Sequence, residues 1–124
     1  MEEKPVAFIV EDDLDLSTVF TEAVRVAGFT SETFLTGDLA LERLANFAPR
    51  LIVLDLHLPG ATGEQILDYI ESQPHLEKVD VIVASADDRL AQKVYGRPTI
   101  TLLKPVNFGL LRDLAQRFVA PPEA

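Results

Sequence analysis

Two apolar runs are each followed directly by carboxylates, which stand as Glu11-Asp12-Asp13 after the first run and as Asp55 after another. Carboxylates that converge within a few ångströms repel one another and raise each other's pKa unless a cation joins them. Oxygen ligands suit a hard cation, and magnesium tolerates a site with few protein ligands and several waters. These acids therefore predict a magnesium site, provided that the fold brings them together.

Ser85 and Lys104 also follow apolar runs directly, and Lys104 is followed by Pro105. Each of these residues has an ordinary explanation when taken alone, since acids after a strand often cap a helix and an Asp often forms a turn. Together they suit one reaction, in which a carboxylate attacks phosphorus. A metal ion and an ammonium group then stabilise the negative charge, and a hydroxyl holds one oxygen.

Unbroken apolar runs are typical of parallel strands that are covered on both faces. Four such runs occur, and a fifth stretch, polar and apolar by turns, indicates an outer strand. In chain order the predicted strands are Val6–Val10, Thr30–Phe34 (the outer one), Leu51–Leu54, Val79–Ala84 and Thr99–Leu103.

Apolar residues at spacings of three and four predict helices between these strands. The stretch Arg89–Tyr95 has room for only about two helical turns. Strands that alternate with helices predict a doubly wound parallel α/β sheet, which binds its ligands at the carboxyl ends of the strands. The four longer predicted helices are Leu14–Ala27, Asp38–Phe47, Thr62–Ser72 and Phe108–Phe118.

The composition fits one domain with a real core, because 48% of the 124 residues are hydrophobic. A net charge of −9 argues against direct binding of nucleic acid or an anionic membrane. The absence of cysteine excludes disulfides and thiolate metal sites. No secretory segment and no run long enough to span a bilayer is present, so a cytoplasmic domain is expected over residues 1–120, with 121–124 a tail or the start of a linker.

From Val6 to about Phe118 the chain resembles the receiver domain of bacterial two-component response regulators. Glu11-Asp12 stands at the acidic pair of that family, and Asp55 in Ile-Val-Leu-Asp-Leu-His-Leu-Pro-Gly stands at the phosphoacceptor. The remaining matches are Pro59-Gly60, Gly63, Ser85-Ala86 and Lys104-Pro105, the last of which is usually a cis peptide in the family.

The resemblance implies a flavodoxin-like or CheY-like fold with strand order 2-1-3-4-5. It implies that Asp55 accepts a phosphoryl group from a sensor histidine kinase or a histidine phosphotransfer protein, assisted by Ser85 and Lys104. It also implies that Mg²⁺ is bound by Asp12, by Asp55, by the backbone carbonyl of His57 and, through water, by Glu11. Such a module is a phosphorylated signalling switch rather than a metabolic enzyme, and homodimerisation stays open.

The chain departs from the family at two places. Thr101 stands where the family often has Tyr or Phe, which puts the usual aromatic switch in question. The stretch from Ser85 to Lys104 is a few residues short, so the fourth helix is expected to be short or irregular. Both departures concern signal output and leave the phosphorylation chemistry untouched.

Three other functions are alternatives to the receiver interpretation. A phosphatase of the haloacid dehalogenase type has Asp-x-Asp directly after its first strand, whereas Asp13-x-Asp15 lies beyond that strand. A pseudo-receiver, which binds partners without being phosphorylated, would lack Asp55, the acidic pair or Lys104, and none is missing. Flavin binding would bring a phosphate next to Glu11-Asp12-Asp13, which would repel it.

Overall fold

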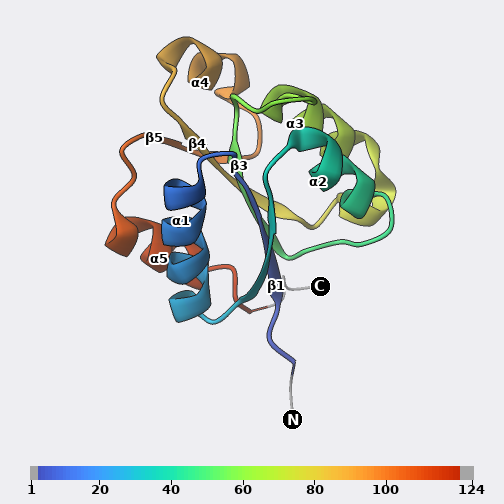
Figure 1. Ribbon diagram of the computed structural model, residues 1–124. Helices are drawn as coiled ribbons and strands as arrows, with labels where there is room; N and C mark the ends of the chain where they lie inside the picture. Colours follow the sequence, from blue (N-terminus) through green and yellow to red (C-terminus); the bar gives the residue numbers. More distant parts are fainter. Residues whose placement is uncertain (1–2, 121–124) are drawn as a thin grey trace.

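The computed structural model describes residues 3–120, in which helices cover both faces of a five-stranded parallel sheet (Figure 1). The spatial order is β2-β1-β3-β4-β5, as predicted. The strands are β1 (Val6–Val10), β2 (Thr30–Phe34), β3 (Leu51–Asp55), β4 (Asp80–Ser85) and β5 (Ile100–Leu103). The helices are α1 (Leu14–Ala27), α2 (Gly37–Leu44), α3 (Gly63–Ser72), the 3₁₀ helix η1 (Pro74–Leu76), α4 (Asp88–Val94) and α5 (Phe108–Gln116).

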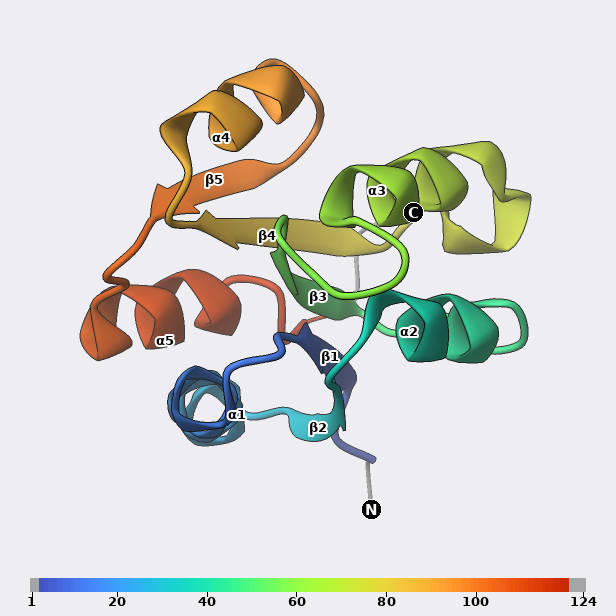
Figure 2. The same ribbon diagram turned by 45° about the horizontal axis from the view of Figure 1, so that its top comes forward.

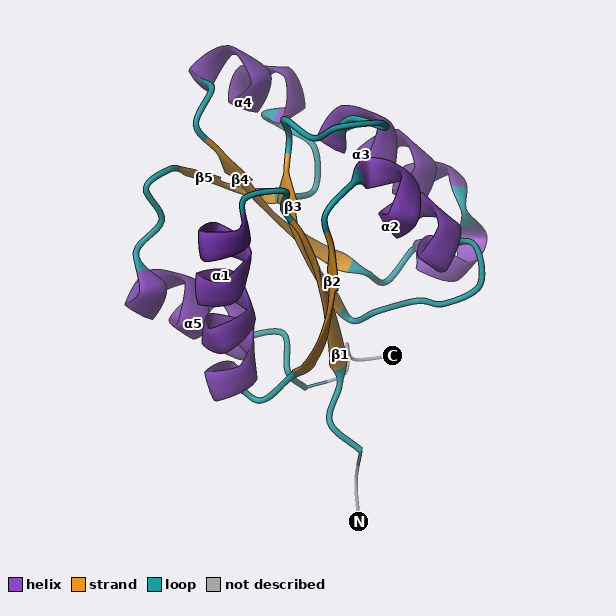
Figure 3. Cartoon of the chain, in the orientation of Figure 1, coloured by secondary structure: helices purple, strands orange, loops and turns teal. Residues whose placement is uncertain are grey.

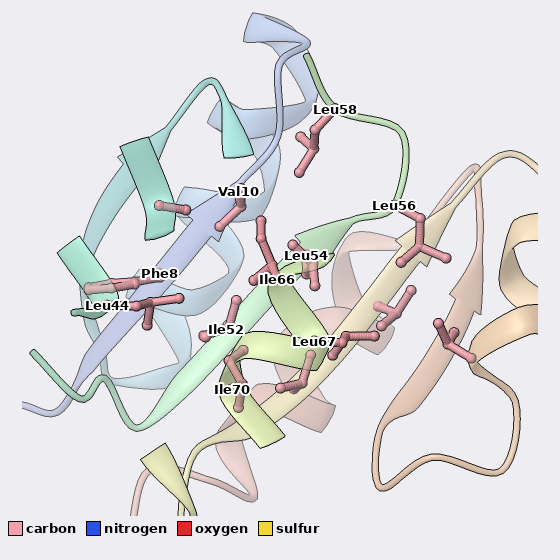
Figure 4. Packing of buried hydrophobic residues seen from close by; sticks show 14 of the residues in the cluster. Phe8, Val10, Leu44, Ile52, Leu54, Leu56, Leu58, Ile66, Leu67 and Ile70 are labelled. Atoms are coloured by element: carbon pink, nitrogen blue, oxygen red, sulfur yellow. The ribbon is translucent and has the colours of Figure 1, made fainter. Parts of the chain in front are cut away.

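The sheet separates two apolar layers. Figures 2 and 3 show α1 and α5 on one face and α2 and α3 on the other. Side chains of β1, β3 and β4 alternate between the faces, so that Phe8 and Ile52 join the α2–α3 layer while Ile9 and Val53 join the α1–α5 layer. Figure 4 shows the first of these layers, in which Ile66 of α3 packs among strand residues. Burial on both faces explains why these strands are continuous apolar runs.

The predicted strand boundaries agree with the structure to within one residue, and α4 is short, with seven residues. Helix α2 ends at Leu44, before the predicted Phe47. The ring of Phe47 instead stacks on Phe8 with centroids 5.7 Å apart, while the guanidinium of Arg43 lies 4.4 Å from the Phe47 ring centroid. Pro49 also disfavours helical backbone at the residue before it.

Pro121–Ala124, predicted as a tail or linker, lies outside the described residues. Among residues 3–120, no helix has the length and apolar character needed to cross a bilayer.

The start of α2 is packed tightly against the loop that joins β3 to α3. The Gly37 N–H donates to the carbonyl of Pro59 at 3.1 Å, and the Ala61 N–H donates to Asp38 Oδ1 at 3.2 Å. A β-carbon built on Gly37 would lie 1.8 Å from the Ala61 carbonyl oxygen, well inside van der Waals contact. Glycine is therefore required at position 37 by close approach of two backbones.

Gly37→Ala is expected to lower the free energy of unfolding by about 2–3 kcal/mol, because either α2 or the loop must move to accept the methyl group. Urea denaturation followed by circular dichroism measures this change. Gly109→Ala is the matched control, since its β-carbon would meet only side-chain ends, Asn107 Oδ1 at 3.2 Å and Arg112 Nη2 at 3.6 Å, and alanine favours the helix. Equal stability of Gly37→Ala and the wild type would contradict the close packing.

Candidate functional site

The carboxyl ends of β1 and β3 bring three of the predicted acids together. The register of β1 and β3 pairs Val10 with Leu54. Glu11 and Asp55 come directly after these two residues and therefore lie side by side. One carboxylate oxygen from each of Glu11, Asp12 and Asp55 lies within 4.8 Å of the other two. Glu11 and Asp55, which are 44 residues apart in the chain, thus join Asp12 in one cluster at the predicted edge of the sheet.

Two of these acids are buried and one is not. Glu11 is 1% exposed and Asp55 is 5% exposed, whereas Asp12 is exposed. Burial raises the pKa of Glu11 to about 6, against the lowering effect of its hydrogen bond with Lys104. The Glu11 N–H donates to the carbonyl of Phe34 at 3.1 Å, which fixes the backbone on which the cluster stands.

Lys104 supplies the cation of the cluster. Its Nζ lies 2.6 Å from Glu11 Oε1 and 3.5 Å from Asp55 Oδ2, and its side chain is 14% exposed. The Lys104 N–H donates to the Ser85 carbonyl at 2.8 Å, which continues the pairing of β5 with β4. The Lys104–Pro105 peptide is cis, in agreement with the resemblance.

Ser85 reaches the site at the end of β4, but its hydroxyl is engaged elsewhere. Ser85 is 1% exposed, and Ala84 beside it pairs with Asp55. Its Oγ donates to the Asp87 carbonyl at 3.1 Å and accepts from the Asp87 N–H, also at 3.1 Å. The hydroxyl is therefore held in a local turn rather than against Asp55.

His57 and Asp13 lie next to the acid cluster, and each makes a hydrogen bond that defines its role. The His57 N–H donates to Asp55 Oδ1 at 3.2 Å, and the His57 side chain is exposed. Asp13 caps α1, since its Oδ1 accepts from the Leu16 N–H at 3.0 Å. Asp13 thus serves the helix start, and Asp12 is the acid that turns into the cluster.

An open cavity of about 650 Å³ lies over these groups and is lined by all of the predicted site residues except Ser85. Asp87, Asp88 and Arg89, at and beside the start of α4, also line it. Arg89 is not among the residues that the sequence predicts for the site. The signal available for it was its place four residues beyond Ser85, in the first turn after the β4 end, where α4 opens onto the cavity.

The pattern of a response regulator receiver domain matches residues 7–116, almost the whole described chain. The chain belongs to the response regulator receiver domain family. Receiver domains are the signalling modules of two-component systems, so the family match supports the receiver interpretation over the phosphatase and flavin-binding alternatives.

Among curated proteins, the receiver domain is 32% identical over 95 residues to the phosphate regulon transcriptional regulatory protein PhoB of Rhizobium meliloti, covering 77% of this chain and 42% of that protein. It is 27% identical over 119 residues to the DNA-binding transcriptional regulator NtrC of Escherichia coli, covering 95% of this chain and 25% of NtrC. The chain thus spans less than half the length of these relatives.

Solved structures agree with this assignment. The response regulator DrrB, a Thermotoga maritima OmpR/PhoB homologue, is 28% identical with a TM-score of 0.78, over 94% of this receiver domain and 52% of DrrB. The chemotaxis response regulator CheY4 of Vibrio cholerae has a TM-score of 0.80 over 94% of this chain and 99% of CheY4. At 20% identity, the likeness to CheY4 concerns the fold alone.

Proposed function

We propose that this receiver domain accepts a phosphoryl group on Asp55 from a phosphohistidine of a sensor histidine kinase or of a histidine phosphotransfer protein. The observation that carries the proposal is the position of Lys104, whose Nζ lies within 4 Å of Asp55 and of Glu11. A buried carboxylate beside a partly buried ammonium group, both lining an open cavity, is suited to attack on an anionic donor.

The acid cluster fits a magnesium ion, because three carboxylates offer oxygens within 4.8 Å of one another while Lys104 alone cannot neutralise them. Asp12 and Asp55 would hold the ion directly, Glu11 through water, and His57 through its backbone carbonyl. When bound, the ion supplies positive charge that offsets the charge of the phosphoryl oxygens.

The residues of the chain then have separate tasks. One carboxylate oxygen of Asp55 forms the new bond to phosphorus as the phosphorus–nitrogen bond breaks, and the electron pair of that bond stays on the imidazole. Lys104 stabilises the added charge through its ammonium group. The Ser85 hydroxyl leaves its turn with Asp87 and donates to a phosphoryl oxygen. The domain catalyses only its own phosphorylation and dephosphorylation.

The partners follow from this chemistry. A protein that carries phosphohistidine must dock over the cavity, and the acidic surface favours contacts with proteins in the cytoplasm over contacts with nucleic acid or membrane. We propose signal output by a change of conformation after phosphorylation, with a second copy of the domain as one candidate partner.

Incubation with acetyl phosphate tests the proposal. Up to one phosphoryl group per chain is expected when MgCl₂ is present, and none is expected when EDTA removes the metal. Intact-protein mass spectrometry counts the added groups. Equal labelling with and without magnesium, or no labelling under either condition, would contradict the proposed function.

Asp12→Ala is expected to weaken magnesium binding by about 10-fold or more, since it removes a carboxylate of the cluster. Asp13→Ala is the matched control, because Asp13 caps α1. Its loss is expected to cost about 1 kcal/mol of stability without removing an oxygen from the cluster. Isothermal titration of each variant with MgCl₂ compares them. Equal losses, or a larger loss for Asp13→Ala, would show that the assignment of Asp12 is wrong.

A further inference from the structure

We propose that Arg89 determines which small phosphodonors the domain accepts, by attracting donors that carry more negative charge to the mouth of the cavity. The inference rests on the proposed function of Asp55 and adds to it a specificity-determining residue on α4. The arrangement that carries it is a side chain of α4 that lines the same cavity as the phosphoacceptor and whose guanidinium makes no ion pair with any of residues 3–120.

The cavity needs such a cation. Among residues 3–120, six carboxylates line it, against two cationic side chains, Lys104 and Arg89. Even with a divalent ion bound, negative charge exceeds positive charge around the cavity. A phosphodonor is itself an anion, so its approach is opposed unless positive charge stands at the entrance.

Lys104 does not supply that attraction, because its ammonium group is already neutralised. It lies 2.6 Å from Glu11 and 3.5 Å from Asp55, and only 14% of its side chain is exposed. It is placed to act on the phosphoryl group once the donor has reached Asp55, and not to draw a donor in from solvent.

Arg89 is exposed, and its guanidinium makes no ion pair within residues 3–120. The carboxylates next to it are engaged by other groups. Asp87 Oδ1 accepts from the N–H groups of Arg89 and Leu90 at 2.9 and 3.3 Å, and Asp88 Oδ2 accepts from Gln92 Nε2 at 3.2 Å. The planar guanidinium thus keeps the donors that match phosphate oxygens.

A plainer explanation is that Arg89 is a solvated residue of a surface helix. Lys93, one helical turn further along α4, separates the two explanations. It is exposed and carries the same charge, but it lines a neighbouring cavity with Thr62 and Glu64 and not the cavity over Asp55. Removing either cation changes the net charge equally. A difference between the phosphorylation rates of the two variants therefore reports the position of the charge rather than the overall field of the protein.

The experiment measures second-order rate constants of Asp55 phosphorylation at saturating magnesium for the wild type, Arg89→Ala, Arg89→Lys and Lys93→Ala. Acetyl phosphate, a dianion near neutral pH, is compared with phosphoramidate, which carries less negative charge. Loss of Arg89 is expected to reduce the rate constant about 5-fold for acetyl phosphate and less for phosphoramidate. Arg89→Lys is expected to keep most of the wild-type rate constant, and Lys93→Ala to stay within about 2-fold of it. Added salt is expected to reduce the difference in rate constant between Arg89→Ala and the wild type.

The lifetime of the phosphorylated protein serves as a further readout, since attraction of the donor leaves it unchanged, and saturating magnesium keeps the metal site occupied in every variant. An unaltered rate in Arg89→Ala, an equal loss in Lys93→Ala, or an equal loss with both donors would overturn the inference while Asp55 remains the acceptor. A wild-type protein that takes no label on Asp55 would instead end the proposed function, and the role of Arg89 with it.

Discussion

Asp55→Asn is expected to abolish labelling by acetyl phosphate, leaving less than about 1% of the wild-type rate. An amide oxygen is a poor nucleophile, and the substitution also removes the negative charge that faces Lys104 at 3.5 Å. The shape of the side chain is kept, so its oxygen can still accept the His57 N–H that Asp55 Oδ1 accepts at 3.2 Å. Phosphate-affinity gel electrophoresis measures the phosphorylated fraction.

The fold of Asp55→Asn should remain intact, which makes the loss of labelling interpretable. Asp55 is 5% exposed beside Glu11, and neutralising one of two buried carboxylates relieves their repulsion. The midpoint of thermal unfolding, measured by circular dichroism, is therefore expected to be no lower than in the wild type. A folded Asp55→Asn protein that still takes one phosphoryl group per chain would contradict the assignment of the acceptor.

Lys104→Ala is expected to slow phosphorylation by about 10²-fold, since one charged donor aimed at the developing charge is lost. Nothing else among residues 3–120 places a cation within 4 Å of Asp55. Rates are measured with acetyl phosphate at several magnesium concentrations. The defect should persist at the highest concentration, because the missing group is the ammonium and not the metal.

Lys104→Arg provides the control for charge alone. The two contacts of Nζ, at 2.6 and 3.5 Å, suit a compact ammonium group in a confined position, and a planar guanidinium is larger. Lys104→Arg is therefore expected to recover only a small part of the rate. Full recovery by arginine, or a wild-type rate in Lys104→Ala, would show that Lys104 does not act on the phosphoryl group.

The fold could be predicted because its determinants are local. Unbroken apolar runs specified β1, β3 and β4, and period-3.6 spacing specified α1 with its observed boundaries. The convergence of Asp12 and Asp55 followed from topology, since the carboxyl ends of adjacent parallel strands share one edge. Predicting these features requires only the pattern of apolar residues along the chain and the right-handedness of the crossovers between parallel strands.

Side-chain partners chosen by tertiary packing could not be predicted. The ion pair of Lys104 with Glu11 joins residues 93 positions apart and depends on their rotamers. The turn that holds the Ser85 hydroxyl against Asp87 depends on how α4 follows β4, and so does the position of the Arg89 side chain in the cavity wall. The end of α2 at Leu44 also departs from the prediction, because Phe47 stacks on Phe8, a contact that periodicity in the sequence does not encode.

Phosphorylation by acetyl phosphate with magnesium, followed by borohydride reduction, tests the central claim most directly. Reduction converts an aspartyl phosphate to homoserine, which tandem mass spectrometry of peptides locates in the sequence. Homoserine at position 55 alone, dependent on both acetyl phosphate and magnesium, is the expected result. Homoserine at Asp12 or Asp13 with Asp55 unmodified, or phosphate on any other residue of the intact wild-type protein, would contradict the account.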